Sequence, residues 1–145
     1  MVKKKINNII VGGGDDTAEH IVWAFEKTLE KKWKSNARFS ILVTDAPCHG
    51  LKYHKKDLFD NYPNGVSNSK NIEDLVEDMA KKDISLICIK LKDDTDIMYK
   101  IFEDIYKKYK IIFNIIELHS PKDLIDIVIN KALEVYDNQR IKDHN

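Results

Sequence analysis

The chain has 145 residues, with 24 basic and 24 acidic side chains, so its formal net charge at pH 7 is zero. That balance gives no long-range attraction to nucleic acid or to an anionic membrane, and we expect neither as a partner. No apolar run approaches the roughly 20 residues that cross a bilayer, and the apolar stretch after the basic start is too short for a signal peptide. Two cysteines cannot build a disulfide framework, so a cytoplasmic setting and one domain are expected.

The first part of the chain is predicted to hold a short strand, a glycine turn and a helix. Ile6–Val11 is apolar and runs into three glycines. Asp15 or Asp16 is expected to cap a helix over residues 17–34, with Glu19 in the first turn, where a negative charge suits the helix dipole. Apolar residues recur in this helix at helical spacing: Ile21, Val22, Phe25, Leu29 and Trp33.

Residues 38–44 are predicted to form a strand that runs directly into Asp45 and a turn. In an open α/β sheet, ligands bind just beyond the carboxyl ends of parallel strands, which makes Asp45 a candidate site residue. A long polar loop over residues 46–70 follows, and Asn61–Gly65 within it has the residues of a tight turn. A loop of that length in a compact domain is usually functional or disordered.

The rest of the chain alternates helices and strands. We predict helices over residues 72–82, capped from Ser69 or Asn71, and 96–109, strands over 84–91 and 111–118, and a final helix that starts at Ser120-Pro121 and ends near Tyr136. Residues 136–145 are expected to be a frayed tail. This alternation predicts a three-layer α/β/α, Rossmann-like fold with a mostly parallel sheet.

Several short motifs, in order along the chain, resemble one known family. They are GGGDDTAEH (12–20), WAFEKTL (23–29), TDAPCHG (44–50), KYH (52–54), DNYPNG (60–65) and TDIMYKIF (95–102). Together they are similar to the von Willebrand factor A domain found in the alpha-kinase family of atypical protein kinases. The resemblance implies a Rossmann-like three-layer domain with a metal-ion-dependent adhesion site, formed by three loops.

The resemblance assigns only part of that metal site to this chain. Asp45 corresponds to the aspartate of the third loop, and residues 14–17 correspond to the second loop, with Asp15 or Thr17 facing the metal. Thr17 stands where the family commonly has proline, and His20 where an acid is usual. The Asp-x-Ser/Thr-x-Ser motif of the first loop has no counterpart. An incomplete site of this kind would hold Mg²⁺ weakly, because Mg²⁺ needs near-ideal octahedral oxygen ligation.

The same resemblance suggests that residues 1–145 correspond to the carboxyl-terminal portion of the family's domain. Strand 39–44, interior in the complete domain, would then be an exposed edge and a template for pairing. Three occupants are open: a second copy of the chain, another polypeptide, or the chain's own Ile6–Val11.

The residues favour three other types of chemistry less. Cys48, His49 and His54 lie close in sequence but lack the fourth ligand and the spacing of a zinc site. Adjacent Cys48 and His49 rarely face each other as a nucleophile and base would. The triple glycine lacks the third glycine of a dinucleotide-binding turn, and two aspartates beside it would repel a phosphate. Cys88, within a strand, is expected to be a buried small hydrophobe.

The sequence therefore predicts a non-catalytic protein-binding or regulatory module of von Willebrand A type. Its partner-binding loop is expected to include Asp45, His49, Tyr53 and His54, and strand 39–44 is expected to bind a protein partner or a second copy. The alternative is a fragment of an alpha-type serine/threonine protein kinase whose catalytic domain lies outside this chain.

Overall fold

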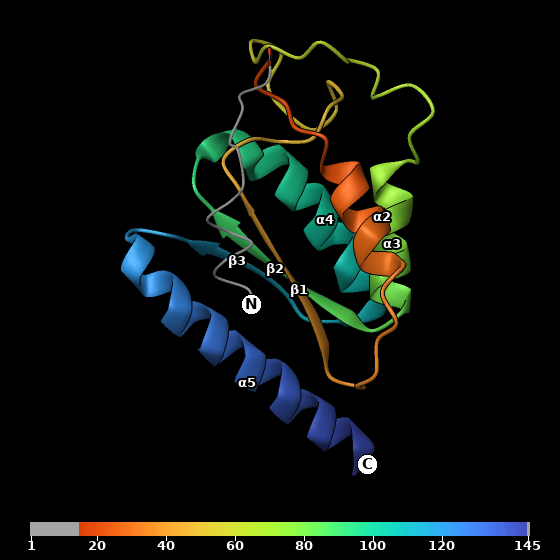
Figure 1. Cartoon of the computed structure of the whole chain (residues 1–145), viewed down its shortest axis with the longest axis vertical. Helices are drawn as coiled ribbons and strands as arrows, with labels where there is room; N and C mark the ends of the chain where they lie inside the picture. Colours follow the sequence, from red (N-terminus) through yellow and green to blue (C-terminus); the bar gives the residue numbers. More distant parts are fainter. Residues whose placement is uncertain (1–14, 145) are drawn as a thin grey trace, which may run out of the picture.

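The computed structural model describes residues 15–144. This part of the chain consists of parallel strands with helices on both sides. The sheet has the order β1 (Arg38–Thr44), β2 (Ile84–Lys90), β3 (Phe113–Glu117), and both pairings are parallel. Helices α2 (Ile21–Leu29), α3 (Ile72–Lys81) and α4 (Asp96–Tyr109) lie on one side of the sheet, and α5 (Leu124–Asp143) lies on the other (Figure 1). The predicted α/β fold with a parallel sheet is thus confirmed. The predicted strand Ile6–Val11 lies outside the described residues.

Strand β2 is the centre of the sheet and is buried on both faces, as its continuous apolar sequence predicts. The register places Leu42 beside Cys88 on the face that packs against α2, α3 and α4. Because side chains alternate along a strand, Ile41 and Ile87 occupy the opposite face, where α5 lies. Within residues 15–144, no strand pairs with the outer side of β1, which is an edge.

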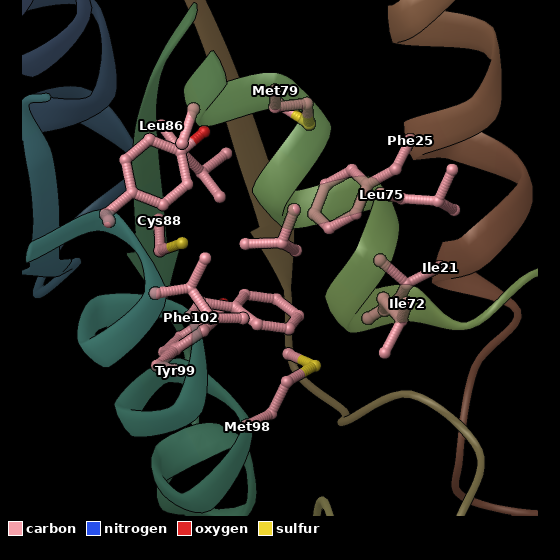
Figure 2. Packing of buried hydrophobic residues seen from close by; sticks show 14 of the residues in the cluster. Ile21, Phe25, Ile72, Leu75, Met79, Leu86, Cys88, Met98, Tyr99 and Phe102 are labelled. Carbon is pink, nitrogen blue, oxygen red and sulfur yellow. The ribbon is translucent and has the colours of Figure 1, made fainter. Parts of the chain in front are cut away.

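The main core lies between the sheet and the three helices of the first layer (Figure 2). The rings of Phe25 and Phe102 meet there with centroids 5.7 Å apart, in a tilted arrangement that aromatic pairs favour. The buried hydroxyl of Tyr106 donates a hydrogen bond of 2.9 Å to the Ile84 carbonyl oxygen. This bond joins α4 to the start of β2 and satisfies a polar group that would otherwise be costly to bury.

Helix α2 is shorter than predicted at both ends. The segment before it is extended: the Glu19 amide donates to the Pro47 carbonyl oxygen at 2.8 Å, and the Thr17 amide donates to the Phe59 carbonyl oxygen. These backbone bonds to the loop hold the segment out of a helix, so the helix follows His20, without a side-chain cap and with no acid in its first turn. At the other end, the Trp33 indole donates to the Thr28 carbonyl oxygen at 3.2 Å, satisfying a terminal carbonyl that continued helix would have used.

Helix α5 continues past the predicted end near Tyr136 to Asp143. Its last turns are stabilised by side-chain bonds: Gln139 donates to Asp143 at 2.8 Å, and Lys142 lies 3.1 Å from Asp83 on the turn before β2. No helix in the described part of the chain combines the length and apolarity needed to cross a bilayer.

The predicted caps at Asn71 and Ser120 and the predicted turn are present, whereas the cap predicted from Asp15 or Asp16 is not. The Asn71 side chain accepts a hydrogen bond from the Glu73 amide at the start of α3. The Ser120 side chain accepts one from the Lys122 amide, where a short 3-10 turn with Pro121 leads into α5. In the long loop, the Gly65 amide donates to the Tyr62 carbonyl oxygen at 2.8 Å and closes the expected turn.

Candidate functional site

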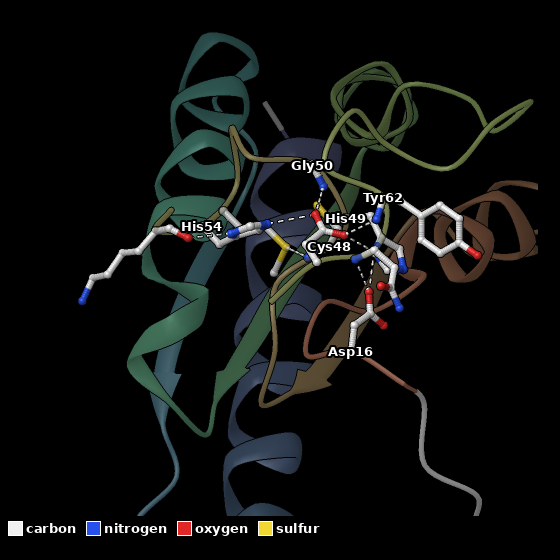
Figure 3. Close-up of polar contacts among 10 residues, drawn as sticks. Asp16, Cys48, His49, Gly50, His54 and Tyr62 are labelled. Carbon is white, nitrogen blue, oxygen red and sulfur yellow. Dashed lines mark hydrogen bonds and ion pairs between the residues drawn. The ribbon is translucent and has the colours of Figure 1, made fainter. Parts of the chain in front are cut away.

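The loop that follows β1 is organised around the carboxylate of Asp60, whose side chain is 1% exposed. Its Oδ2 accepts from the Gly50 amide at 2.8 Å and from His54 Nε2 at 3.0 Å, and its Oδ1 accepts from His49 Nδ1 and the Tyr62 amide, both at 2.8 Å (Figure 3). A carboxylate has about four lone-pair positions, so all are used. We call Asp60 with His49 and His54 the Asp60 cluster.

Two opposing effects act on the ionisation of Asp60. Burial alone would raise its pKa, but the hydrogen bonds from the Gly50 amide, His49, His54 and the Tyr62 amide together outweigh burial and hold the pKa well below its usual range. Asp60 is therefore a carboxylate at neutral pH. Its carboxylate thus joins positions 49, 50, 54 and 62 of a stretch that contains no helix or strand.

His54 supports the loop from the inside. Its Nδ1 lies 2.8 Å from the Lys55 carbonyl oxygen, which can only accept, so that nitrogen carries a proton. Its Nε2 faces the ionised Asp60, and its side chain is fully excluded from solvent. The sequence-based prediction placed His54 in the partner-binding loop; in the structure it lies beneath the surface of that loop.

His49 connects the loop to the segment before α2. Besides Asp60, its Nδ1 lies 3.7 Å from Asp16 Oδ2, and the edge of its ring packs against the ring of Tyr62 with centroids 4.9 Å apart. Asp16 in turn accepts a hydrogen bond of 2.7 Å from the Asn61 amide. The loop and residues 16–19 are thus fastened at several points.

The ligand atoms of Asp16, His49 and Asp60 lie within 4.8 Å of one another, close enough to surround a metal ion. However, every lone pair of Asp60 already accepts a hydrogen bond, and His49 Nδ1 donates one of them. A metal would have to replace bonds that hold the loop together. We therefore assign the three residues a structural role.

The residues predicted to bind Mg²⁺ lie elsewhere at this end of the sheet. Asp45 follows β1 with its side chain half exposed, and its carboxylate accepts a bond of 2.8 Å from the Lys92 ammonium group. That bond holds the pKa of Asp45 below its ordinary value. Asp15 and Thr17 are both exposed. The Lys92 cation already binds one oxygen of Asp45 and would repel a metal there, so the arrangement fits Mg²⁺ poorly, and the site remains a prediction.

A pocket of about 410 Å³ opens between the loop, the start of α2 and the start of α3. Its lining includes His49 and Tyr53 from the predicted partner-binding loop, together with Leu51, Pro63 and Ile72. Asp45 is not part of this lining; it borders a second hollow beside β1, which Val43 and Leu91 also line.

The wall of the pocket is held by polar contacts to α3. The Tyr53 hydroxyl donates to Glu73 Oε1 at 3.1 Å, and Lys52 Nζ approaches the same oxygen at 2.5 Å. Burial, followed by the negative charge of Glu73, raises the pKa of Tyr53, so its hydroxyl stays a donor. Gly50 has φ +115°, and a Cβ there would come within 3.1 Å of the Tyr53 ring, so the turn requires glycine.

The cysteine of the loop is not placed for chemistry. Cys48 is fully buried, and burial raises the pKa of its thiol, which disfavours the thiolate that a nucleophile or a metal ligand needs. Its neighbour His49 is engaged with Asp60. Cys88 is buried within β2, as predicted.

Asp60 and Asp16 were not identified from the sequence as site residues. Asp60 had a local signal, because an aspartate side chain can accept a hydrogen bond from the backbone amide two residues later, as it does from the Tyr62 amide. Its bonds to His49 and His54 depend on the path of the loop, which the sequence does not reveal.

Comparison with known proteins gives one partial relationship. No family model matches the chain. A curated relative, "Alpha-protein kinase vwkA" of Dictyostelium discoideum, is 35% identical over 81 residues. The match covers 55% of this chain but 13% of that protein, so no catalytic domain is shown here. The relationship is compatible with the resemblance found in the sequence motifs.

Proposed function

We propose that the chain is a non-catalytic protein-binding module of von Willebrand A type, which recognises its partner with the pocket formed by the loop after β1. The observation that supports this most directly is the Asp60 cluster. A loop whose conformation is fixed before binding loses little conformational entropy when a partner docks, so more of the contact energy appears as affinity.

The lining of the pocket suits recognition better than catalysis. His49 Nδ1 is already engaged with Asp60, and the Tyr53 hydroxyl is engaged with Glu73. Leu51, half exposed at the rim, offers an apolar contact beside the polar Lys52. A mixture of apolar and polar groups on a pre-formed surface is typical of protein interfaces.

A second candidate function is supported by the partial relative. If this chain corresponds to part of an alpha-type protein kinase, phosphotransferase activity would reside in a longer polypeptide. The module would then regulate the kinase domain or bring it to its substrate. We expect no phosphate transfer from ATP by the purified chain, alone or with Mg²⁺. Transfer above the level of a buffer control would refute the non-catalytic proposal.

The binding proposal is tested by quantitative affinity capture with three forms of the chain. Leu51→Asp introduces a charge at the pocket rim, and Ile97→Asp introduces the same charge at an exposed site on α4, outside the pocket. Proteins captured by the wild type and by Ile97→Asp, but lost with Leu51→Asp, would support the proposal. Capture that is unaffected by Leu51→Asp, or no specific capture, would refute it.

A further inference from the structure

Within the described residues, strand β1 presents an edge that no other strand covers, and Arg38 at its start is its one charged residue. The strand pairs with β2 in unbroken register over all seven of its residues, and within residues 15–144 its other side has no strand partner. Residues 39–44 contain no proline, lysine or acid, the residues with which natural edge strands prevent association. Val43, on the α5 side of the sheet, is 47% exposed.

Helix α5 carries a second apolar surface that the rest of residues 15–144 leaves exposed. Ile125, Ile129, Leu133 and Tyr136 follow one another at spacings of four, four and three, so they form one stripe along the helix, and each is at least half exposed. Val135, on the side toward the sheet, is buried. When a helix has apolar residues on the side that faces the sheet and also on a second side, both sides are expected to pack against other protein surfaces.

The carboxyl-terminal end of the stripe lies near the segment that enters β1. Tyr136 lines a hollow together with residues 35–37, which lead into β1. Asn138 and Lys142 line another hollow, which reaches Lys110 and Ile112 before β3 and also Asn36 and Arg38 at the start of β1. We call the outer edge of β1, Val43 and the α5 stripe together the β1–α5 surface; Tyr136 is the stripe residue that borders the segment before β1.

The two ends of β1 carry opposite charge. The segment that enters β1 contains Lys31, Lys32 and Lys34, all exposed. At the exit, Asp45 and Glu19 are exposed and border the same hollow; Lys92 pairs with Asp45 at 2.8 Å, so these three groups carry one net negative charge. If a second copy of β1 paired antiparallel with the first, the acidic end of each strand would lie beside the basic end of the other. This arrangement is electrostatically complementary.

We propose that the β1–α5 surface binds a second copy of this chain. A two-fold axis perpendicular to the sheet near Ile41 would pair β1 antiparallel with β1 of the partner subunit and join the two three-stranded sheets into one. Because this axis is perpendicular to the sheet, both α5 helices lie on the same face of the joined sheet. The two α5 stripes would then lie side by side and cover each other. Phe39 and Val43 are equidistant from Ile41, so the apolar face of β1 matches itself when reversed. This surface is distinct from the loop pocket, and the inference does not depend on the proposed function.

The test is sedimentation equilibrium of the full chain at several concentrations. Wild type is expected to show a monomer–dimer equilibrium, and Val43→Lys and Leu133→Glu should each weaken it at least tenfold. Ile115→Lys, on the opposite edge strand β3 and similarly exposed, is the matched control and should leave the equilibrium unchanged. All three positions are at least 43% exposed, so the variants should fold, which circular dichroism would verify. A monomeric wild type, or a dimer that survives Val43→Lys, would overturn the inference.

Cross-linking tests the geometry separately. Ile41→Cys should form a disulfide with its symmetry mate under mild oxidation, because opposite side chains of an antiparallel pair lie close together. The native Cys48 and Cys88 are fully buried and should not interfere. Ile115→Cys is the control and should remain uncross-linked. A dimer that forms without a cross-link at position 41 would show that another surface is used and would also overturn the inference.

Discussion

His54 Nε2 and Asp60 Oδ2 form a hydrogen bond of 3.0 Å, and both side chains are almost completely excluded from solvent. Breaking a buried pair by removing one partner is costly, because the other group is left desolvated and unpaired. The loop after β1 therefore depends on one carboxylate to a degree that its polar sequence does not suggest.

We expect Asp60→Asn to destabilise the protein by about 2–4 kcal/mol, because the amide nitrogen would face groups that themselves donate hydrogen bonds. Urea denaturation measures the change. Asp57→Asn, an exposed change in the same loop, is the control and should cost less than about 0.5 kcal/mol. Equal stability of the two variants would show that the cluster contributes little.

The same pair predicts a pH dependence. Because the pKa of Asp60 is depressed in the folded state, its contribution to stability is complete above the unfolded pKa of about 4 and is lost as pH falls below it. The difference in unfolding free energy between wild type and Asp60→Asn should therefore shrink in acid. Urea midpoints of both proteins between pH 2 and pH 7 test this, and a constant difference would contradict it.

Gly50→Ala should destabilise the loop more than Gly65→Ala. Both glycines have positive φ, but a Cβ at position 50 would meet the Tyr53 ring at 3.1 Å, whereas a Cβ at position 65 would have nothing within 4 Å. We expect a cost of about 1–3 kcal/mol at position 50 and a smaller one at position 65. Thermal denaturation of both variants would decide the order.

Lys110→Gly should stabilise the protein by up to about 1 kcal/mol. Lys110 ends α4 with φ +57°, a left-handed conformation that glycine adopts without strain. Lys108→Gly, an exposed change two residues earlier within the helix, should instead destabilise by about 1 kcal/mol. Melting temperatures that moved in the same direction would exclude this explanation.

Titration with Mg²⁺ tests the predicted metal site. We expect weak binding that Asp45→Ala abolishes and that Lys92→Ala strengthens by about 1.4- to 5-fold, because the lysine competes for the carboxylate through an exposed ion pair worth about 0.2–1 kcal/mol. Isothermal titration calorimetry gives the affinities. Wild-type binding that is indifferent to both changes would remove Asp45 from the site.

The predictable parts of the fold were those with local causes. Continuous apolar sequence identified β2 as a central strand, and Asn71 and Ser120 marked helix starts through bonds to nearby backbone amides. Helix α2 was predicted too long, because its ends are decided by distant groups: Pro47 and Phe59 before it, and the Trp33 indole after it.

The candidate site divides in the same way. The sequence indicated that the loop after β1 would hold polar functional groups, and His49 and Tyr53 do line its pocket. It did not indicate Asp60, because the bonds that make Asp60 central reach back six and eleven residues through an irregular loop. Such bonds have no periodic pattern.

The amino-acid sequence by itself determined the parallel α/β architecture, since apolar periodicity and capping act over a few residues. The tertiary structure alone decided which carboxylate is buried, which histidine is hidden beneath the loop, and where the α5 stripe lies relative to the edge of β1. These features depend on contacts between segments far apart in the chain, and only packing in three dimensions brings such segments together.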